Sequence, residues 1–133
     1  MLINEYLPGQ GILPHEDGAA YHPIVATVSL GAPIVFDVYS KQQEEPKWRV
    51  LQERRSLLVT TGEVYGKCMH GVEAVEEDEN LRDGEGGVCN WSLLGDREQF
   101  EDGWRRRETR VSLTFRDVFK VKKLGKGFGF LGE

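Results

Sequence analysis

The sequence predicts a mainly β domain, in the form of a sandwich, a barrel or a jelly roll. Short runs rich in β-branched and aromatic residues are separated by turns that contain glycine and proline. No long stretch shows a convincing helical period. The chain has 133 residues, of which 39% are hydrophobic and 29% charged, as expected for one globular domain with one core. We therefore expect residues 1–133 to form a single domain.

The N-terminal half contains the first expected strands. Residues 2–6, "LINEY", alternate as a strand does, whereas residues 7–20, "LPGQGILPHEDGAA", are rich in glycine and proline and indicate a loop. Residues 23–39, "PIVATVSLGAPIVFDVY", contain two β-branched runs broken by "GAP", which predicts a hairpin or a corner. Residues 40–48, "SKQQEEPKW", are expected to form a polar connection.

The C-terminal half alternates between strand-like and highly charged segments. Residues 55–72, "RSLLVTTGEVYGKCMHGV", predict two strands around a "TTGE" turn. Residues 73–108 have no steady period and much charge, so we expect a flexible insertion, with the acidic run 76–85 as a solvated loop. Residues 109–124 predict a strand that could continue into a second one, and the glycine-rich tail 125–133 is expected to be loosely held.

The charge of the chain bears on its partners. The net charge is −5, which argues against a broad, nonspecific grip on nucleic acid. A local basic rim is still compatible with that balance. The candidates for phosphate contact are the run "RRR" at 105–107 and the lysines at 120, 122, 123 and 126, although edge-strand lysines also protect against aggregation.

Several features bear on the compartment. The only two cysteines, Cys68 and Cys89, form no disulfide framework, so a reducing compartment is expected. No apolar run approaches the ~20 residues needed to span a bilayer, and no basic segment followed by an apolar one opens the chain. We therefore expect an intracellular protein of the cytoplasm or the nucleus with no membrane association.

A histidine and an aspartate stand one residue apart in "PHEDG". His15 and Asp17 could be two ligands of a metal, and His70, at the end of a strand-like run, could be the third. Two histidines and one carboxylate suit Fe(II) and leave three positions for oxygen and a co-substrate. The spacing alone is weak, since a polar surface turn and an unrelated histidine give the same letters. A zinc site that adds Cys68 is a further alternative.

Two arginines share one face of a predicted strand in "RVSLTFR". Strand alternation places Arg110, Ser112, Thr114 and Arg116 on that face. The strand could be half-buried with its arginines in water, or it could point them into a pocket. Guanidinium groups bind carboxylates through two parallel hydrogen bonds, so two of them suit a dicarboxylate such as 2-oxoglutarate.

A third polar pair lies on the first expected strand. Asn4 and Tyr6 share a face by the same period of two. Their amide and phenol could complete the hydrogen bonds of a buried dicarboxylate, although on their own they are ordinary strand residues.

Together these segments resemble the AlkB family of iron- and 2-oxoglutarate-dependent dioxygenases. The family run of Asn-x-Tyr-x-x-Gly, His-x-Asp, a Ser-Leu-Gly strand end, a distal His and Arg-x-Asn-x-Thr-x-Arg stands here as "NEYLPGQGILPHEDG", "VSLG", "MHGV" and "RVSLTFR". The sequence of these segments is similar above all to that of the AlkB homologue six subgroup. The resemblance covers residues 2–72 and 109–123. Ser112 departs from the family pattern, which often has asparagine there.

The resemblance implies a double-stranded β-helix of the jelly-roll type that lacks its N-terminal portion. Iron would be held by His15, Asp17 and His70. Arg110 would bind the far carboxylate of 2-oxoglutarate with help from Tyr6. Arg116 and Asn4 would lie towards the iron-bound end of 2-oxoglutarate. Ser112 and Thr114 would line the same strand face as further co-substrate contacts.

The activity implied by the resemblance is oxidative demethylation, commonly of a nucleic acid base. Oxygen and 2-oxoglutarate would be consumed, and the hydroxylated N-methyl group would leave as formaldehyde. A methylated base in DNA or RNA would have to be flipped or single-stranded to reach the iron. The alternative is an inactive nucleic-acid or protein interaction module that retains the geometry of the site.

Overall fold

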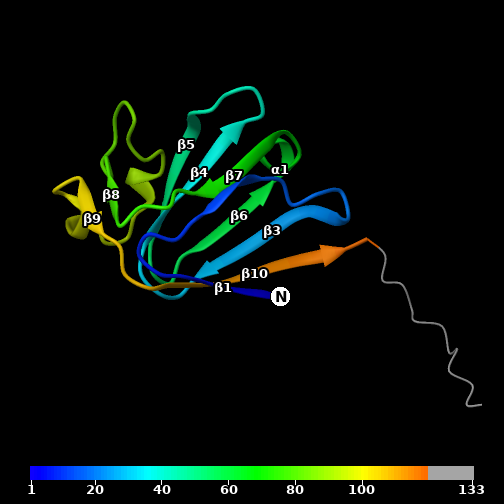
Figure 1. Cartoon of the computed structure of the whole chain (residues 1–133), viewed down its shortest axis with the longest axis horizontal. Helices are drawn as coiled ribbons and strands as arrows, with labels where there is room; N and C mark the ends of the chain where they lie inside the picture. The colour runs from blue at the N-terminus through cyan, green and yellow to red at the C-terminus, as the bar shows by residue number, and fades with distance from the viewer. Residues whose placement is uncertain (120–133) are drawn as a thin grey trace, which may run out of the picture.

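The computed structural model describes residues 1–119 of the chain (Figure 1). The expected lysines at 120–126 and the tail 125–133 lie outside the described residues. Within residues 1–119, no helix is both long and apolar enough to cross a membrane. The described part is built almost entirely of strands, which confirms the mainly β prediction.

Ten strands and one short helix follow one another along the described chain. In order, the elements are β1 Leu2–Tyr6, β2 Ile12–His15, β3 Tyr21–Ser29, β4 Ile34–Ser40, β5 Pro46–Gln52, β6 Leu57–Thr61, α1 Gly62–Lys67, β7 Cys68–Val72, β8 Glu77–Glu79, β9 Trp104–Arg106 and β10 Arg110–Val118. Two single 3₁₀ turns, Trp91–Leu93 and Arg97–Phe100, lie between β8 and β9.

Two antiparallel sheets of four strands form the body of the fold (Figure 1). One has the order β1-β10-β3-β6 and the other β2-β7-β4-β5, so from β1 to β7 each strand lies in the other sheet from the one before it, except that β4 and β5 are neighbours in one sheet. Side chains from both sheets line one cavity between them. This is the arrangement of a double-stranded β-helix, and it confirms the predicted jelly roll.

The expected strands are present, but their connections differ in detail. The two runs within 23–39 are β3 and β4, and because these strands belong to different sheets the "GAP" between them is a corner. The predicted "TTGE" turn is wrong, since α1 separates β6 from β7. The expected loop 7–20 contains β2, and the expected polar connection 40–48 already contains the start of β5.

The segment 73–108 is folded, which corrects the expectation of a flexible insertion. Four of its apolar side chains are buried in one cluster with two residues of β4 and β5; the cluster consists of Val35, Leu51, Leu81, Val88, Leu94 and Phe100. Asn90 also pairs with both backbone groups of Leu51, accepting from its N–H and donating to its carbonyl, each at 2.9 Å. The segment therefore covers the outer face of β4 and β5 and satisfies part of the β5 edge.

A buried ion pair fixes the two strands of this segment. Arg107 donates to both carboxylate oxygens of Asp78, at 2.9 and 2.7 Å, and both residues are about 5% exposed. The expectation of a fully solvated acidic run is therefore wrong at Asp78. The expectation that the whole run "RRR" could touch phosphates is wrong at Arg107.

The outer face of the β1-β10-β3-β6 sheet is apolar and exposed. The side chains that share this face by register and alternation include Ile3, Ile24, Leu57, Val59 and Phe115, which are 43% to 64% exposed. Large solvent-facing apolar patches are uncommon on soluble domains.

Candidate active site

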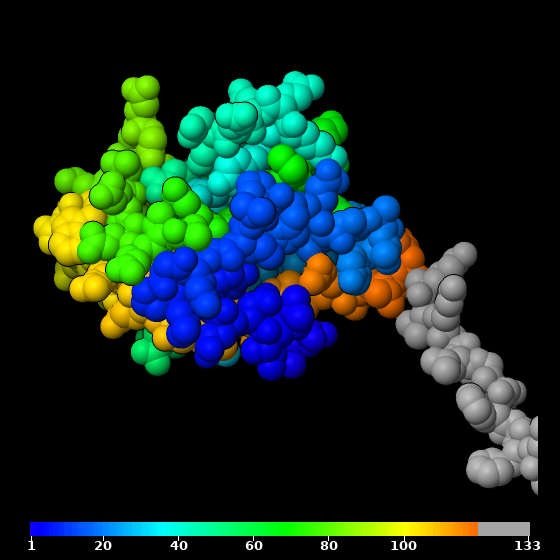
Figure 2. Space-filling view, viewed as in Figure 1, coloured from blue at the N-terminus to red at the C-terminus, as the bar shows by residue number. Residues whose placement is uncertain are grey.

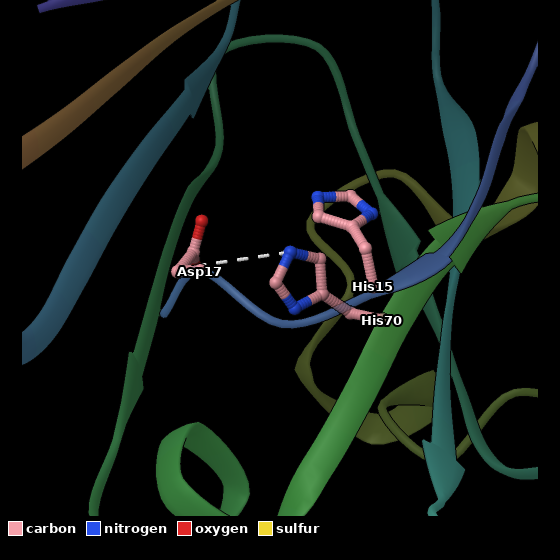
Figure 3. Close-up of side chains that lie close together, drawn as sticks. All are labelled: His15, Asp17 and His70. Atoms are coloured by element: carbon pink, nitrogen blue, oxygen red, sulfur yellow. Dashed lines mark ion pairs between the residues drawn. The ribbon is translucent and has the colours of Figure 1, made fainter. Parts of the chain in front are cut away.

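Two histidines face each other across neighbouring strands (Figure 3). His15 is the last residue of β2, and His70 is its register partner on β7. Their rings lie edge to face, with centroids 4.5 Å apart. Gly71 follows His70, and a Cβ atom there would lie 2.8 Å from the backbone oxygen of Ile12. The glycine therefore lets β2 and β7 approach closely enough for the two imidazoles to converge.

Asp17 completes a group of three ligand side chains. It lies in the bend between β2 and β3, where Gly18 adopts a φ of +86° that suits a residue without a Cβ. One ligand atom from each of His15, Asp17 and His70 can be chosen so that all lie within 4.8 Å of one another. The structure thus brings the three predicted iron ligands together, and Cys68 is not part of the group.

The hydrogen bond of His15 and the pKa of His70 suit a metal. The Nδ1 atom of His15 donates to the carbonyl of Leu13 at 2.9 Å, which leaves the Nε2 lone pair free. Burial lowers the pKa of His70, and His15 and Arg116 lower it further, whereas Asp17 opposes them. Neutral imidazoles next to a carboxylate are the donor set that suits Fe(II).

Asp17 is held in place from the opposite sheet. Arg116 on β10 donates from Nη1 to Oδ1 of Asp17 at 2.5 Å. The other carboxylate oxygen lies 3.8 Å from Nε2 of His70. The ring of Phe36 stacks on His70 at a centroid distance of 5.2 Å. These contacts fix the carboxylate and one imidazole before any metal binds.

The expected co-substrate residues lie on β1 and β10, which pair antiparallel. Tyr6 is opposite Arg110 and Asn4 is opposite Ser112 in the register, so their side chains share one face. This face lines the cavity between the sheets, which has a volume of about 110 Å³. All nine predicted site residues line it: Asn4, Tyr6, His15, Asp17, His70, Arg110, Ser112, Thr114 and Arg116.

Arg110 is a buried cation with neutral partners. It is 4% exposed and donates to Ser112 Oγ at 2.9 Å, to Ser29 Oγ at 3.1 Å and to Gln52 Oε1 at 2.6 Å. Its Nε has no acceptor, and no carboxylate of residues 1–119 pairs with it. Burial lowers the pKa of Arg110 to about 10. An uncompensated guanidinium on a cavity wall is a site for an anion.

The neighbours of Arg110 are the part of the site that sequence reasoning missed. Ser29 ends β3 in "VSLG", where the serine was noted only as part of a strand end. Gln52 ends β5, which was not foreseen as a strand. Ser29 also donates to Gln52 at 2.9 Å, so the two form one hydrogen-bonded support for the guanidinium. No local pattern marks Gln52; only the pairing of β4 with β5 places it there.

Tyr6 contributes a phenol near the same cation. The guanidinium carbon of Arg110 lies 5.8 Å from the centre of the Tyr6 ring. Burial raises the pKa of Tyr6, with Arg110 opposing, so the phenol keeps its proton at neutral pH and can donate to an anion. The arrangement fits a dicarboxylate that reaches from the metal ligands to Arg110.

Comparisons with known proteins agree with this geometry. Residues 1–116 match the family described as "2OG-Fe(II) oxygenase superfamily". The chain is 39% identical over 132 residues to a Danio rerio protein named probable RNA/DNA demethylase ALKBH6, covering 91% of this chain and 53% of that protein. It is 36% identical over 124 residues to the Macaca fascicularis tRNA (carboxymethyluridine(34)-5-O)-methyltransferase ALKBH8, covering 89% of this chain and 17% of that protein.

A solved structure shares the fold. The structure of OsALKBH1 superposes with a TM-score of 0.55 at 21% identity, covering 86% of this chain and 48% of that one. The chain spans about half the length of the Danio rerio relative and a smaller share of ALKBH8. The family's cofactors, Fe(II) and 2-oxoglutarate, are those that the donor set and the buried guanidinium fit. The chain therefore belongs to the 2OG-Fe(II) oxygenase superfamily.

Proposed function

We propose that the chain is an iron- and 2-oxoglutarate-dependent dioxygenase that demethylates a nucleic acid base. One observation carries the proposal: the cavity between the sheets is lined by a His-Asp-His group at one place and by an uncompensated buried guanidinium at another. A purely structural arginine would be expected to have an internal carboxylate partner, as Arg107 has in Asp78.

Each predicted residue has a physical role in this proposal. His15, Asp17 and His70 bind the metal, and Arg116 orients the Asp17 carboxylate. Arg110 binds the far carboxylate of 2-oxoglutarate, with Tyr6 as a second donor, while Asn4, Ser112 and Thr114 line the path between. The bound groups would supply the oxidation: O2 would give one oxygen atom to 2-oxoglutarate, which leaves as succinate and carbon dioxide, and the other to the substrate's N-methyl group, which then leaves as formaldehyde.

The substrate class rests on relatives and on the reach of the site. The Danio rerio relative is named a probable RNA/DNA demethylase. The Macaca fascicularis relative is named a tRNA methyltransferase, so both names refer to nucleic acids. Because the ligand group lies between two sheets, a base could reach it only when flipped or single-stranded. A net charge of −5 favours recognition at a local site over a general grip on phosphates.

We also propose that the protein acts inside the cell, in the cytoplasm or the nucleus. Cys68 and Cys89 are both free thiols, and Fe(II) needs reducing surroundings. Imaging of the tagged protein, with fractionation as an independent readout, would test this; enrichment in a secreted fraction would contradict it.

A coupled assay tests the function. Succinate and formaldehyde are measured with Fe(II) and 2-oxoglutarate, with and without methylated single-stranded DNA or RNA oligonucleotides. We expect turnover in the wild type, none in Asp17→Ala, and unchanged turnover in the surface control Glu101→Gln. Turnover that survives Asp17→Ala would overturn the assignment. Ligand binding without any product on either oligonucleotide would instead favour the interaction module.

A further inference from the structure

A second cavity lies on the far side of the β2-β7-β4-β5 sheet from the iron ligands. It is a groove of about 830 Å³ between the β4–β5 connection and the segment that follows β7. Figure 2 shows it as a notch between the cyan tip of that connection and the yellow-green segment after β8. Strand alternation separates the two cavities, since Phe36 lines the iron site and the next residue, Asp37, lines the groove.

The lining of this acidic groove is dominated by carboxylates. Seven acidic side chains line it against one basic side chain, Arg49; they are Asp37, Glu44, Glu45, Glu73, Glu77, Asp78 and Glu79. The five glutamates are all exposed, so they can meet a partner from solvent. Such a surface repels nucleic acid and attracts cations.

One carboxylate oxygen at the floor of the groove accepts no hydrogen bond. Asp37 is 3% exposed, and its Oδ1 has no hydrogen-bond partner among residues 1–119. The other buried aspartate of this region, Asp78, has both oxygens bonded by Arg107. Burial is therefore similar for the two aspartates, and only Asp37, which lines the groove, keeps an oxygen without a hydrogen bond.

Arg49 forms an ion pair with Asp37 but donates no hydrogen bond to it. Its Nε lies 3.6 Å from Oδ1 of Asp37, beyond hydrogen-bond reach. Its Nη1 instead donates to the carbonyl of Gly86 at 2.9 Å. The one basic side chain that lines the groove is thus shared between an ion pair with Asp37 and the backbone of the opposite rim. Arg107 neutralises Asp78, and the glutamates that line the groove remain in excess.

The geometry points to an organic cation as the occupant. Among residues 1–119, the only group of three ligand side chains close enough to hold a metal ion is His15, Asp17 and His70, so the groove acids are too far apart to chelate one together. Their spread over 830 Å³ suits several donors on an extended chain instead. Arginine and lysine side chains are such donors.

We propose that the acidic groove docks a basic peptide segment of a partner protein, one of whose arginine or lysine side chains donates to Asp37. The rim glutamates Glu44 and Glu45 would attract and orient the remaining basic side chains. Because the groove opens on the face opposite the iron ligands, the peptide would leave the entrance to the iron site free. The inference is independent of the reaction proposed above.

The ionisation of Asp37 supports this geometry. Burial raises the pKa of Asp37 to about 6, with Glu73 and Asp78 adding to the rise and Arg49 and Arg107 opposing it. A cation that donates to the carboxylate would favour its charged form and lower that pKa.

Fluorescence anisotropy with labelled synthetic peptides tests the proposal on the full chain. The probes are a short peptide of alternating arginine and glycine, its lysine counterpart, and a glutamate counterpart. We expect the two basic peptides to bind and the acidic one not to bind. Asp37→Asn keeps the shape but removes the charge, and should weaken binding by at least about thirtyfold, the effect of losing one partner of a desolvated charge pair.

Matched variants keep the outcome decisive. Glu44→Gln with Glu45→Gln should weaken binding and reduce its salt dependence, whereas Glu98→Gln with Glu101→Gln, an exposed acidic pair outside the groove, should leave it unchanged. All variants should retain affinity for Fe(II). Absence of wild-type binding, full binding by Asp37→Asn, or equal loss in the outside pair would each overturn the proposal. If Asp37→Asn does not fold, the comparison of the two glutamate pairs decides.

Discussion

Replacing Arg110 with methionine should separate ligand binding from stability. In the folded protein the pKa of Arg110 is about 10, against an ordinary value of 12.5. At about 1.4 kcal/mol per pKa unit, holding the charge in the cavity without an anion costs about 3 kcal/mol. Because the folded pKa is the lower one, this cost applies in full below about pH 10 and fades as the pH rises towards the unfolded value.

The methionine variant no longer bears the cost of the buried charge, but it also loses the hydrogen bonds of Arg110, and the two effects on stability oppose each other. The methionine variant loses hydrogen bonds to Ser29, Gln52 and Ser112, each contributing about 1 kcal/mol. We therefore expect its free energy of unfolding without ligand to stay within about 1 kcal/mol of the wild type. Binding of 2-oxoglutarate should fall by about 2–5 kcal/mol, or roughly thirtyfold to several thousandfold in Kd.

Two measurements test this prediction. Anaerobic calorimetry with Fe(II) present gives the Kd for 2-oxoglutarate, and urea unfolding of the metal-free protein gives stability. Arg106→Met is the matched control, because that side chain is 73% exposed on β9 and should affect neither quantity. The reasoning is refuted if Arg110→Met binds 2-oxoglutarate within threefold of the wild type. A loss of stability above about 3 kcal/mol would show that Arg110 is structural.

Three further predictions follow from packing and charge. Gly71→Ala should weaken Fe(II) binding by about tenfold or more, since its methyl group would lie 2.8 Å from a backbone oxygen of β2, whereas Gly66→Ala, with nothing within 4 Å, should not; equal affinities in an anaerobic titration would contradict this. Asp37→Asn should raise the free energy of unfolding by up to about 3 kcal/mol at pH 8 and have little effect at pH 4, because a raised carboxyl pKa makes the charged form costly above about pH 6; a difference that does not vary with pH in urea unfolding would be inconsistent with it. Phe100→Ala should cost about 3–5 kcal/mol in thermal or urea unfolding, against almost nothing for Leu93→Ala, which is 82% exposed; a small loss at Phe100 would restore the expectation of a flexible insertion.

The strands that carry the site were predictable because side chains alternate with a strict period of two. That period alone placed Asn4 with Tyr6, and Arg110 with Ser112, on common faces, whatever the tertiary fold. The metal ligands were harder, since His15 and His70 are far apart in sequence and meet only through the pairing of β2 with β7. The end of a strand-like run made His70 a candidate, and the resemblance to a family then gave it the role of third iron ligand.

The remaining features depend on tertiary contacts that leave no local signal. The segment 73–108 has no period because it folds irregularly over β4 and β5, with buried residues such as Leu81 and Phe100 separated by charged turns. Glycine and proline around β2 indicated a loop, but the strand forms because β7 pairs with it. The support of Arg110 by Gln52 likewise requires β5, whose charged start reads as a polar connection.

The most direct test of the central claim is an anaerobic absorption titration of the protein with Fe(II) and 2-oxoglutarate. The account predicts a metal-to-ligand band that needs both components and that is absent from His15→Ala, Asp17→Ala and His70→Ala. A wild-type protein without the band, or a band that persists after removal of any of the three side chains, would contradict it.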